Sequence, residues 1–183
     1  KKTKGAFKMK RMITILFMLL LIPLSCSAIS LEELQSNPEQ YEKIIEAPSG
    51  TIYLELNSIK SLRNSPPYYT LQAKVYSVLY DTVAIAESTR FFNYDDNRST
   101  LSLLNKIVEE NSKRSFSEQN NMLLTELEKD CGMSYSDETV KYYKFNGEFA
   151  GTGTPLYSQK IKYNTNIAFV ASCAFKQYYK HYF

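Results

Sequence analysis

Three cysteines and a single histidine carry the most versatile side-chain chemistry in this 183-residue chain. Cys131 and Cys173 lie far apart and have no CxxC spacing, which argues against a redox or metal-binding thiol pair. His181 is the third residue from the C-terminus, and no nucleophile motif of the GxSxG type accompanies it. We therefore expect no catalytic residue, no metal site and no cofactor, and we expect that the chain is not an enzyme.

Two short polar segments resemble ion-binding loops, and turns explain both more simply. A Ca²⁺ loop that started at Asp95-Asp96-Asn97 would need Gly where Thr100 stands and a bidentate Glu where Lys106 stands. Gly151-Thr152-Gly153-Thr154-Pro155 lacks the lysine and the glycine spacing of a phosphate-binding loop. We expect a solvated turn at each place.

The first 28 residues have the order of a secretory signal peptide. Three basic residues precede an apolar run over residues 12–22, and small residues at 25–28 close it. The run is shorter than the roughly 20 residues of a membrane-spanning helix. We therefore expect an exported protein, in the periplasm or on the outer cell surface. Met9 and Met12 are candidate starts, which would leave residues 1–8 upstream of the natural protein.

Two processing routes are open at the end of this segment. Cys26 is a candidate lipidation site, although Pro23 stands where a lipobox usually has Leu. Cleavage after Ala28 is the alternative, with Cys26 and Ala28 as the two small residues that a signal peptidase requires. A retained anchor is a third alternative, and the short apolar run argues against it. The one membrane attachment that we expect is thus a lipid on Cys26.

Export also changes what the other two cysteines imply. In an oxidising compartment the simplest state of Cys131 and Cys173 is a disulfide, which would tie the C-terminal helix to the body of the fold. In the chain-entropy model, closing a loop of this length stabilises a domain by about 4 kcal/mol.

The charge pattern argues against a nucleic-acid partner. Six of the 22 Lys and Arg residues lie in the first 28 residues, whereas all 19 Asp and Glu residues follow them. The remaining chain is mildly acidic, and its basic residues are dispersed rather than clustered in a stripe. We expect a protein partner, either a host matrix protein or an envelope protein.

The residues after the signal segment predict an α+β fold. Ser30 and Glu33 form a capping box for a short helix that ends before Pro38, and residues 29–50 are expected to be this helix and a linker. A single domain is predicted over residues 51–183. Strands are expected where β-forming residues alternate, at positions 51–56, 68–86 and 89–94.

Residues 99–129 have helical spacing, and a second capping box at Ser115 and Glu118 divides them into two helices. Asn146-Gly147 predicts a tight primed turn between a strand at 139–145 and a strand that starts near Glu148.

The last helix follows the cap cluster at 164–166. Lys176 and Lys180 are expected to face solvent. One apolar stripe is expected to face the sheet: Ile167, Val170, Ala171, Ala174 and Tyr178. The predicted architecture is an antiparallel meander with helices packed on one face and the C-terminal helix held by the disulfide.

The cysteines, aromatic residues and turns of the C-terminal half form a familiar pattern. It consists of D-C-G at 130–132, Y-Y-K-F-N-G at 142–147 and N-T-N-I-A-F-V-A-S-C at 164–173, and it resembles the surface-adhesin protein E family of bacterial envelope proteins. Residues 52–59 and the strands up to Tyr94 resemble the N-terminal meander of that family. The chain departs from the family in its lack of Trp and in its long helical insert. The resemblance implies an exported antiparallel sheet with a helix packed on it, which binds host matrix or serum proteins.

Tyrosine is abundant enough to form an interaction surface. Adjacent tyrosines in a strand point to opposite faces, so one of each pair is expected to be exposed. The candidate interface residues are Tyr142, Tyr143, Tyr178 and Tyr179. The leading hypothesis is a non-enzymatic, adhesin-like envelope protein that binds another macromolecule. A periplasmic inhibitor or chaperone-like module that acts on an envelope enzyme is the alternative, and a small hydrolase with an unrecognised site is a third.

Overall fold

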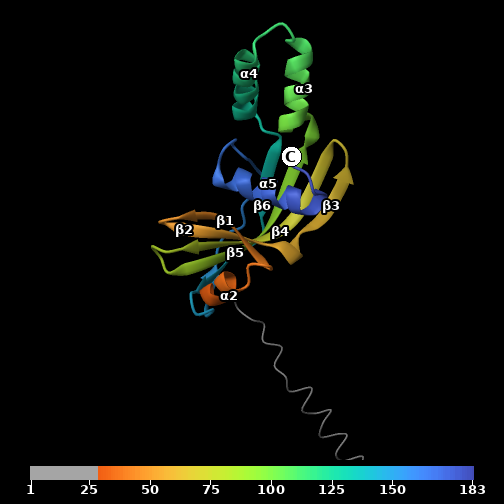
Figure 1. Ribbon diagram of the computed structural model, residues 1–183. Coiled ribbons are helices and arrows are strands. Elements are labelled where there is room, and N and C mark those ends of the chain that lie inside the picture. The colour runs from red at the N-terminus through yellow and green to blue at the C-terminus, as the bar shows by residue number, and fades with distance from the viewer. Residues whose placement is uncertain (1–28) are drawn as a thin grey trace, which may run out of the picture.

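The computed structural model describes residues 29–183 (Figure 1). The predicted signal peptide and the lipidation site at Cys26 lie outside the described residues. The elements in chain order are α2 (Leu31–Ser36), β1 (Tyr41–Ala47), β2 (Gly50–Glu55), η1 (Leu56–Ser58), β3 (Lys60–Ser65), β4 (Tyr68–Leu79), β5 (Ala84–Asp95), η2 (Asp96–Arg98), α3 (Thr100–Glu110), α4 (Phe116–Lys129), β6 (Met133–Asp137), β7 (Lys141–Lys144), β8 (Phe149–Thr152), β9 (Gln159–Lys160) and α5 (Asn166–Tyr179).

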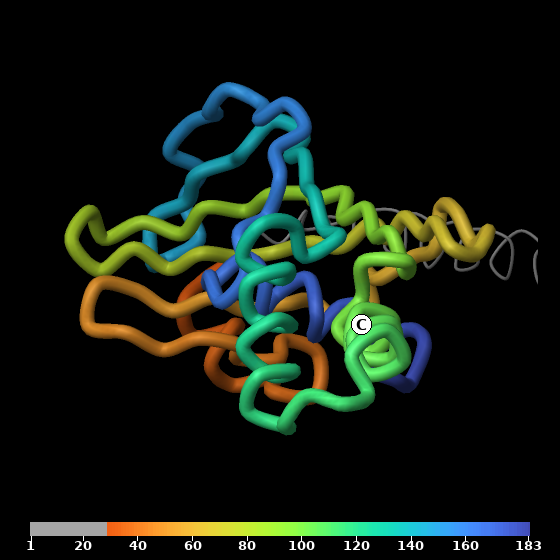
Figure 2. The backbone as a smooth tube through the Cα atoms, turned by 90° about the horizontal axis from the view of Figure 1, so that it is seen from above, coloured from red at the N-terminus to blue at the C-terminus, as the bar shows by residue number. Residues whose placement is uncertain are grey.

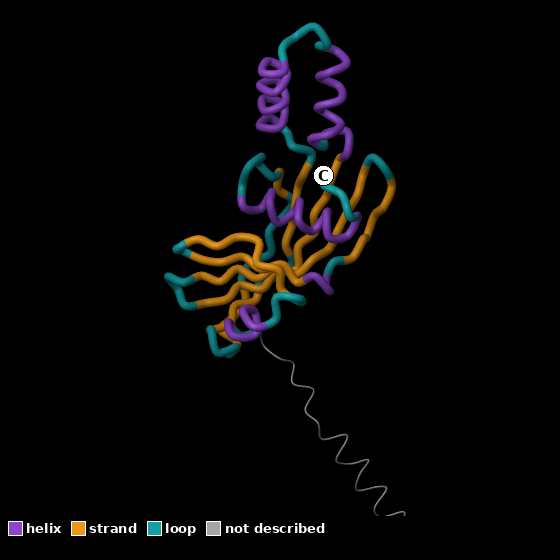
Figure 3. Tube along the Cα trace, in the orientation of Figure 1, coloured by secondary structure: helices purple, strands orange, loops and turns teal. Residues whose placement is uncertain are grey.

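A nine-stranded antiparallel sheet confirms the predicted α+β class. Its centre is the long β4–β5 hairpin, paired from Tyr68 with Asp95 to Leu79 with Ala84. Along its first half β4 pairs with β3, and along its second half it pairs with β2. Strand β5 likewise pairs with β7 along its first half and with β6 along its second half. The sheet is thus more than a meander, because the central hairpin has different neighbours at its two ends (Figure 3).

Two hydrophobic cores lie on opposite faces of this sheet. Successive side chains of a strand point to opposite faces. Accordingly, Leu71 and Val75 of β4 belong to the first core, whereas Tyr76 and Val78 belong to the second. Helix α5 covers the first core, and α2 packs on the second through the buried Leu34. The prediction that the helices pack on one face is therefore wrong. Both faces of the sheet carry apolar side chains, and a different helix buries those of each face.

Helix α5 docks on the sheet with a stripe that is slightly rotated from the predicted one. Lys176 and Lys180 are exposed, as predicted. Tyr178 is 44% exposed rather than facing the sheet, because Phe175 fills the place beside the ring of Tyr94. The buried residues of the helix are Ala168, Val170, Ala171, Ala174 and Phe175.

Residues 41–47, expected to be part of a linker, form the edge strand β1. This strand pairs with β2 from Tyr41 with Glu55 to Ala47 with Gly50. Its register shifts between Lys43 and Ile45, which interrupts the alternation of apolar and polar residues. The missing alternation explains why the sequence pattern did not predict a strand here.

The hairpin at Asn146-Gly147 is confirmed, but its turn is longer than predicted. The Gly147 amide donates to the Lys144 carbonyl at 2.9 Å, and the Lys144 amide donates to the Glu148 carbonyl at 2.8 Å. Gly147 has a φ of 86°, whereas Asn146 is not among the residues with positive φ. Residues 145–147 therefore form a three-residue loop between Lys144 and Glu148, with Gly147 in the left-handed region, and not a two-residue primed turn.

Helices α3 and α4 form a hairpin that projects beyond one end of the sheet (Figures 1 and 3). Both helices were predicted. Ser115 is the predicted N-cap of α4, and Ser99 is the N-cap of α3; the side chains of both accept backbone hydrogen bonds. Ser115 and Glu118 complete the capping box. The view from above shows the two helices side by side (Figure 2).

Candidate functional site

The structure contains no disulfide within the described residues, so the predicted Cys131–Cys173 bond is wrong. Cys131 is buried, and its thiol donates to the Ile161 carbonyl at 3.1 Å. Cys131 shares a small cavity with Ala168 and Ser172 on one side of α5. Cys173 follows Ser172 and so lies about 100° further round that helix. Burial, and next the nearby Glu42 carboxylate of β1, raises the pKa of its thiol. The two thiols therefore lie on different sides of α5.

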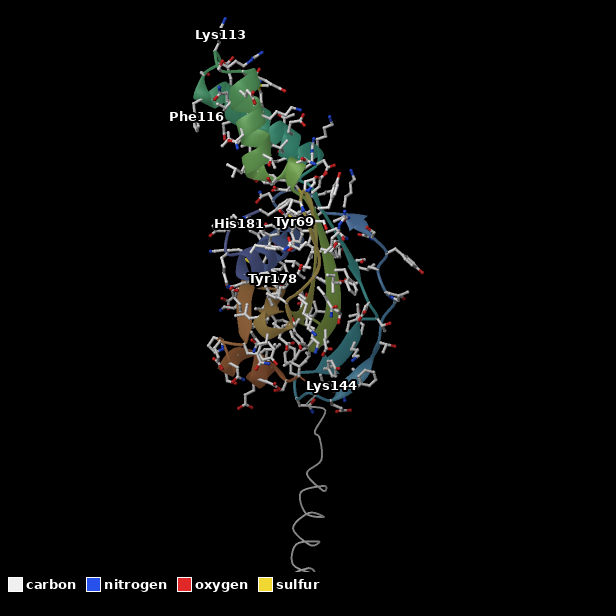
Figure 4. The ribbon with its side chains drawn as sticks, turned by 90° about the vertical axis from the view of Figure 1, so that its right-hand side faces the viewer. Tyr69, Lys113, Phe116, Lys144, Tyr178 and His181 are labelled. Carbon is white, nitrogen blue, oxygen red and sulfur yellow. The ribbon has the colours of Figure 1, made fainter. Side chains whose placement is uncertain are left out.

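The four candidate interface tyrosines do not form one surface. Tyr143 of β7 is buried in the second core, and Tyr142 is half-buried against Gly153. Tyr179 packs on the first core, on the opposite face of the sheet, and the Tyr178 ring meets it edge-on, with 4.9 Å between ring centres. Figure 4 places Tyr178 on the α5 side and Lys144, at the end of β7, at the lower end of the molecule. A shared binding role for these residues stays a prediction.

The two polar segments that resemble ion-binding loops are not the plain turns that we expected. Asp96 and Asn97 belong to the 3-10 helix η2, and Gly151 and Thr152 end strand β8. The Asp95 carboxylate accepts from the Asn97 amide at 3.2 Å, and the Gly153 amide donates to the Val140 carbonyl at 2.7 Å. The exposed His181 ring packs against Phe175 with 5.3 Å between ring centres. Within residues 29–183 no group of three or more His, Cys, Asp or Glu side chains is placed to hold a metal ion.

The most distinctive exposed feature is the apolar surface of the projecting hairpin. The two helices meet through buried leucine and isoleucine side chains: Leu103, Ile107, Leu123 and Leu127. Four large apolar side chains remain exposed, namely Leu101, Val108, Phe116 and Leu124. We call these four residues the hairpin surface.

Helix geometry places most of the hairpin surface on one side of the hairpin. Leu104, Val108 and Leu101 follow one line along α3, about 100° round from the buried stripe. Leu124 lies one residue, or about 100°, past the buried Leu123 on α4. The two helices run in opposite directions. A residue that follows a contact residue by one position therefore lies on the same side of the hairpin in α3 and in α4. Phe116, the first residue of α4, is 80% exposed near the tip (Figure 4).

The opposite side of the hairpin has a different character. A groove of about 480 Å³ runs between the helices there and combines apolar and charged side chains, among them Ile107, Met122, Lys106, Glu110 and Glu126. Arg98 closes its base, where the guanidinium donates to the Asp130 carbonyl at 3.1 Å. The hairpin is therefore charged on the groove side and apolar on the other.

A second candidate site is a cavity under α2, which we call the carboxylate cavity. It has a volume of about 480 Å³, and ten residues from most of the surrounding elements line it: Ile29, Glu33, Tyr41, Glu55, Lys74, Tyr76, Glu87, Lys141, Tyr143 and Phe149. The side chains of Glu55 and Glu87 are only 14% and 15% exposed. Each has a lysine at the limit of ion-pair distance, with Lys74 Nζ 4.0 Å from Glu55 and Lys141 Nζ 3.9 Å from Glu87.

Tyrosine hydroxyls complete the polar lining of the carboxylate cavity. Tyr76 donates to Glu55 Oε2 at 2.8 Å, and Tyr41 donates to Glu33 Oε1 at 3.3 Å. Burial, and next the nearby carboxylates, raise the pKa of both tyrosines far above their ordinary value. Both hydroxyls therefore remain protonated donors. The sequence patterns did not predict this site. The available signals were charged residues inside predicted strands, Glu55 at 51–56 and Lys74 at 68–86.

No helix among residues 29–183 is long and apolar enough to cross a membrane. Comparisons with protein-family models, with curated proteins and with solved structures found no match to this chain.

Proposed function

We propose that this protein is an exported, non-enzymatic binding module of the bacterial envelope that contacts a protein partner through its hairpin surface. The observation that carries the proposal is the exposure of Leu101 and Phe116, at 65% and 80%, on a hairpin that projects from the sheet. Large exposed apolar side chains that gather on one element commonly mark protein interfaces, whereas single scattered ones are normal on any surface. The resemblance to the surface-adhesin protein E family supports an adhesin-like role for the protein as a whole. The hairpin is a departure from that family, so its proposed role depends on its exposed apolar residues alone.

The position of the hairpin supports display away from the cell. The described chain starts beside α2, and the hairpin lies at the opposite end of the molecule (Figure 1). A lipid on Cys26 would be joined to Ile29 by at most about 11 Å of extended chain, since each residue spans up to about 3.6 Å. Anchoring there would keep the α2 end close to the membrane and direct Phe116 outward.

A binding assay on the exported protein tests this proposal. Wild-type protein is immobilised, and its affinity for purified host matrix and serum proteins is compared with that of the double variant Val108→Ser/Phe116→Ser. The variant is expected to bind at least about tenfold more weakly, a loss of about 1.4 kcal/mol, with an unchanged melting midpoint. Tyr157→Ser is the matched control, because Tyr157 is 86% exposed in a loop outside the hairpin.

Equal affinity of the wild type and the double variant would contradict the proposed surface. Binding of an envelope enzyme in place of host proteins, with inhibition or rescue of its activity, would instead support the inhibitor or chaperone-like alternative. Added protease on intact cells separates the two locations, because only a surface-displayed chain is cleaved.

A further inference from the structure

Glu87 and Lys141 face each other in the carboxylate cavity without a hydrogen bond between them. They are direct partners in the register of β5 and β7, so both side chains lie on the same face of the sheet. Lys141 Nζ lies 3.9 Å from Glu87 Oε1, which is longer than an N–H···O hydrogen bond. An ammonium group has three donors and a carboxylate accepts several hydrogen bonds, so each group can also bind an opposite charge on a ligand.

Glu87 is more available to a ligand than the other buried carboxylate of the pairs, Glu55. Glu55 Oε2 accepts from the Tyr76 hydroxyl at 2.8 Å. Among residues 29–183, Glu87 has Lys141 as its one ionic partner and makes no hydrogen bond. Every fully buried polar side-chain atom in this part of the chain has a hydrogen-bond partner. The Glu87 oxygens are therefore not fully buried, and they are accessible from the cavity that Glu87 lines.

The two charges lie at different depths. The Glu87 side chain is 15% exposed, whereas that of Lys141 is 53% exposed, so the carboxylate lies deeper and the ammonium lies nearer to solvent. A ligand with a positive charge alone would be repelled by Lys141, and one with a negative charge alone would be repelled by Glu87. A ligand that carries both charges can pair with both groups and leaves the net charge of the cavity unchanged.

Aromatic rings supply the apolar part of the cavity. Phe149 of β8 is 55% exposed, and its ring meets that of Tyr143 edge-on with 5.8 Å between ring centres. The rings of Tyr41 and Tyr76 meet in the same way at 5.6 Å. Small-molecule sites have volumes of about 300–1,000 Å³ and combine apolar walls with a few polar groups. With about 480 Å³, this cavity has the size and lining for a small ligand that is partly apolar.

We propose that the carboxylate cavity binds a free α-amino acid with an apolar side chain, whose ammonium pairs with Glu87 and whose carboxylate pairs with Lys141. Both charges of such a ligand are attached to one carbon atom, so they can reach two protein groups that lie 3.9 Å apart. A residue inside a peptide lacks both charges and does not fit. The ammonium points inward, the carboxylate points toward solvent, and the apolar side chain contacts Phe149.

This site is separate from the proposed protein-binding surface. The cavity lies under α2, whereas the hairpin surface lies at the opposite end of the molecule (Figure 1). The proposal therefore adds a small-molecule ligand to the proposed function and does not depend on it.

Isothermal titration calorimetry of the exported, purified protein tests the proposal with three compounds that share a phenyl ring. L-Phenylalanine carries both charges, phenethylamine lacks the carboxylate, and hydrocinnamate lacks the ammonium. L-Phenylalanine is expected to bind with a Kd below about 1 mM, and each of the other two compounds at least about tenfold more weakly.

Two variants test the role of each charge. Lys141→Met should remove the preference for L-phenylalanine over phenethylamine, and Glu87→Gln should remove the preference over hydrocinnamate. Lys144→Met is the matched control with unchanged affinities, because Lys144 is an equally exposed lysine of β7 that pairs with Glu148 outside the cavity lining. Lys141 is half exposed, so Lys141→Met should keep the wild-type melting midpoint and provides the test even if Glu87→Gln fails to fold.

Three results would overturn the proposal: no binding of L-phenylalanine or L-leucine up to about 10 mM, equal affinity of the wild type for the three phenyl compounds, or unchanged preferences in both variants. Tighter binding of phenethylamine than of L-phenylalanine would also overturn it, since the cavity would then be a site for cations. None of these readouts involves a protein partner. Failure here would therefore leave the hairpin surface standing, and failure of the hairpin variants would leave the amino-acid site standing.

Discussion

Arg90 Nε donates a hydrogen bond to Asp137 Oδ1 at 2.9 Å and joins β5 to the end of β6. The two residues are direct partners in the strand register. The Asp137 side chain is 2% exposed, whereas that of Arg90 is 17% exposed and lies over the Tyr135 ring, with Cζ 5.7 Å from its centre. The acid is therefore fully enclosed, while the base retains access to water.

This asymmetry predicts that the two halves of the pair tolerate replacement differently. Arg90→Met leaves a buried carboxylate without its cation and is expected to lower the free energy of unfolding by about 3 kcal/mol. Asp137→Asn leaves an arginine that can reach water and is expected to cost less than about 1 kcal/mol. Urea unfolding measures both. Arg114→Met, at an exposed ion pair with Glu118, should change little, and equal losses for Arg90 and Asp137 would contradict the prediction.

The same pair predicts a pH dependence. Burial raises the pKa of Asp137, although the Arg90 charge opposes the shift. A carboxyl whose pKa is higher in the folded state stabilises the fold while it is protonated, and this contribution is lost as the pH rises through the folded-state pKa. Wild-type stability should therefore fall relative to that of Asp137→Asn as the pH is raised from acid toward neutral. Parallel curves for the two proteins in urea unfolding at several pH values would refute this.

Gly147 is expected to be the most sensitive residue of the β7–β8 loop. Its φ of 86° is accessible to Gly and Asn but unfavourable for a β-branched residue. Gly147→Val should lower the stability by about 1–2 kcal/mol, whereas Gly147→Asn should lose only part of this. Thermal unfolding of the two variants tests the difference, and equal stability would mean that the turn is not formed as described.

Val170 is expected to hold α5 on the sheet. It is fully buried on that helix, next to the equally buried Ala171. Val170→Asp removes apolar burial that contributes about 1.5–3 kcal/mol and adds a charge to the core. Chemical denaturation should show a large loss for this variant and little change for Lys180→Asp on the exposed side. If both changes are tolerated, the helix is an appendage of the fold.

Both thiols are expected to be free in the folded protein. The melting midpoint should then be the same with and without a reductant, and non-reducing mass analysis after alkylation of the unfolded chain should find two modified cysteines among residues 29–183. Under native conditions the half-buried Cys173 should be alkylated before Cys131, which is 2% exposed. A midpoint that falls on reduction would show a disulfide that the structure lacks.

Local patterns were enough to predict the helical hairpin and the position of the β7–β8 turn, although not the length of that turn. The capping box of Ser115 and Glu118 joins groups only three residues apart, and the turn at Asn146-Gly147 depends on which residues accept a positive φ. Neither depends on distant parts of the chain. The spacing of apolar residues in α5 likewise indicates a buried face, but the observed face is rotated from the predicted one, with Phe175 buried and Tyr178 exposed.

The pairing of distant residues could be decided only by the tertiary structure. Strand β1 has a bulge that hides its alternation, so only its pairing with β2 makes it part of the sheet. Cys131 and Cys173 suit a disulfide by composition, but the rotation of α5 on the sheet directs their thiols to different sides. Glu55 and Glu87 become one site only because strand register turns both toward the face that α2 covers. A sequence determines the conformational preference of each segment, whereas side-chain neighbours depend on register and helix rotation, which are set when the whole core packs.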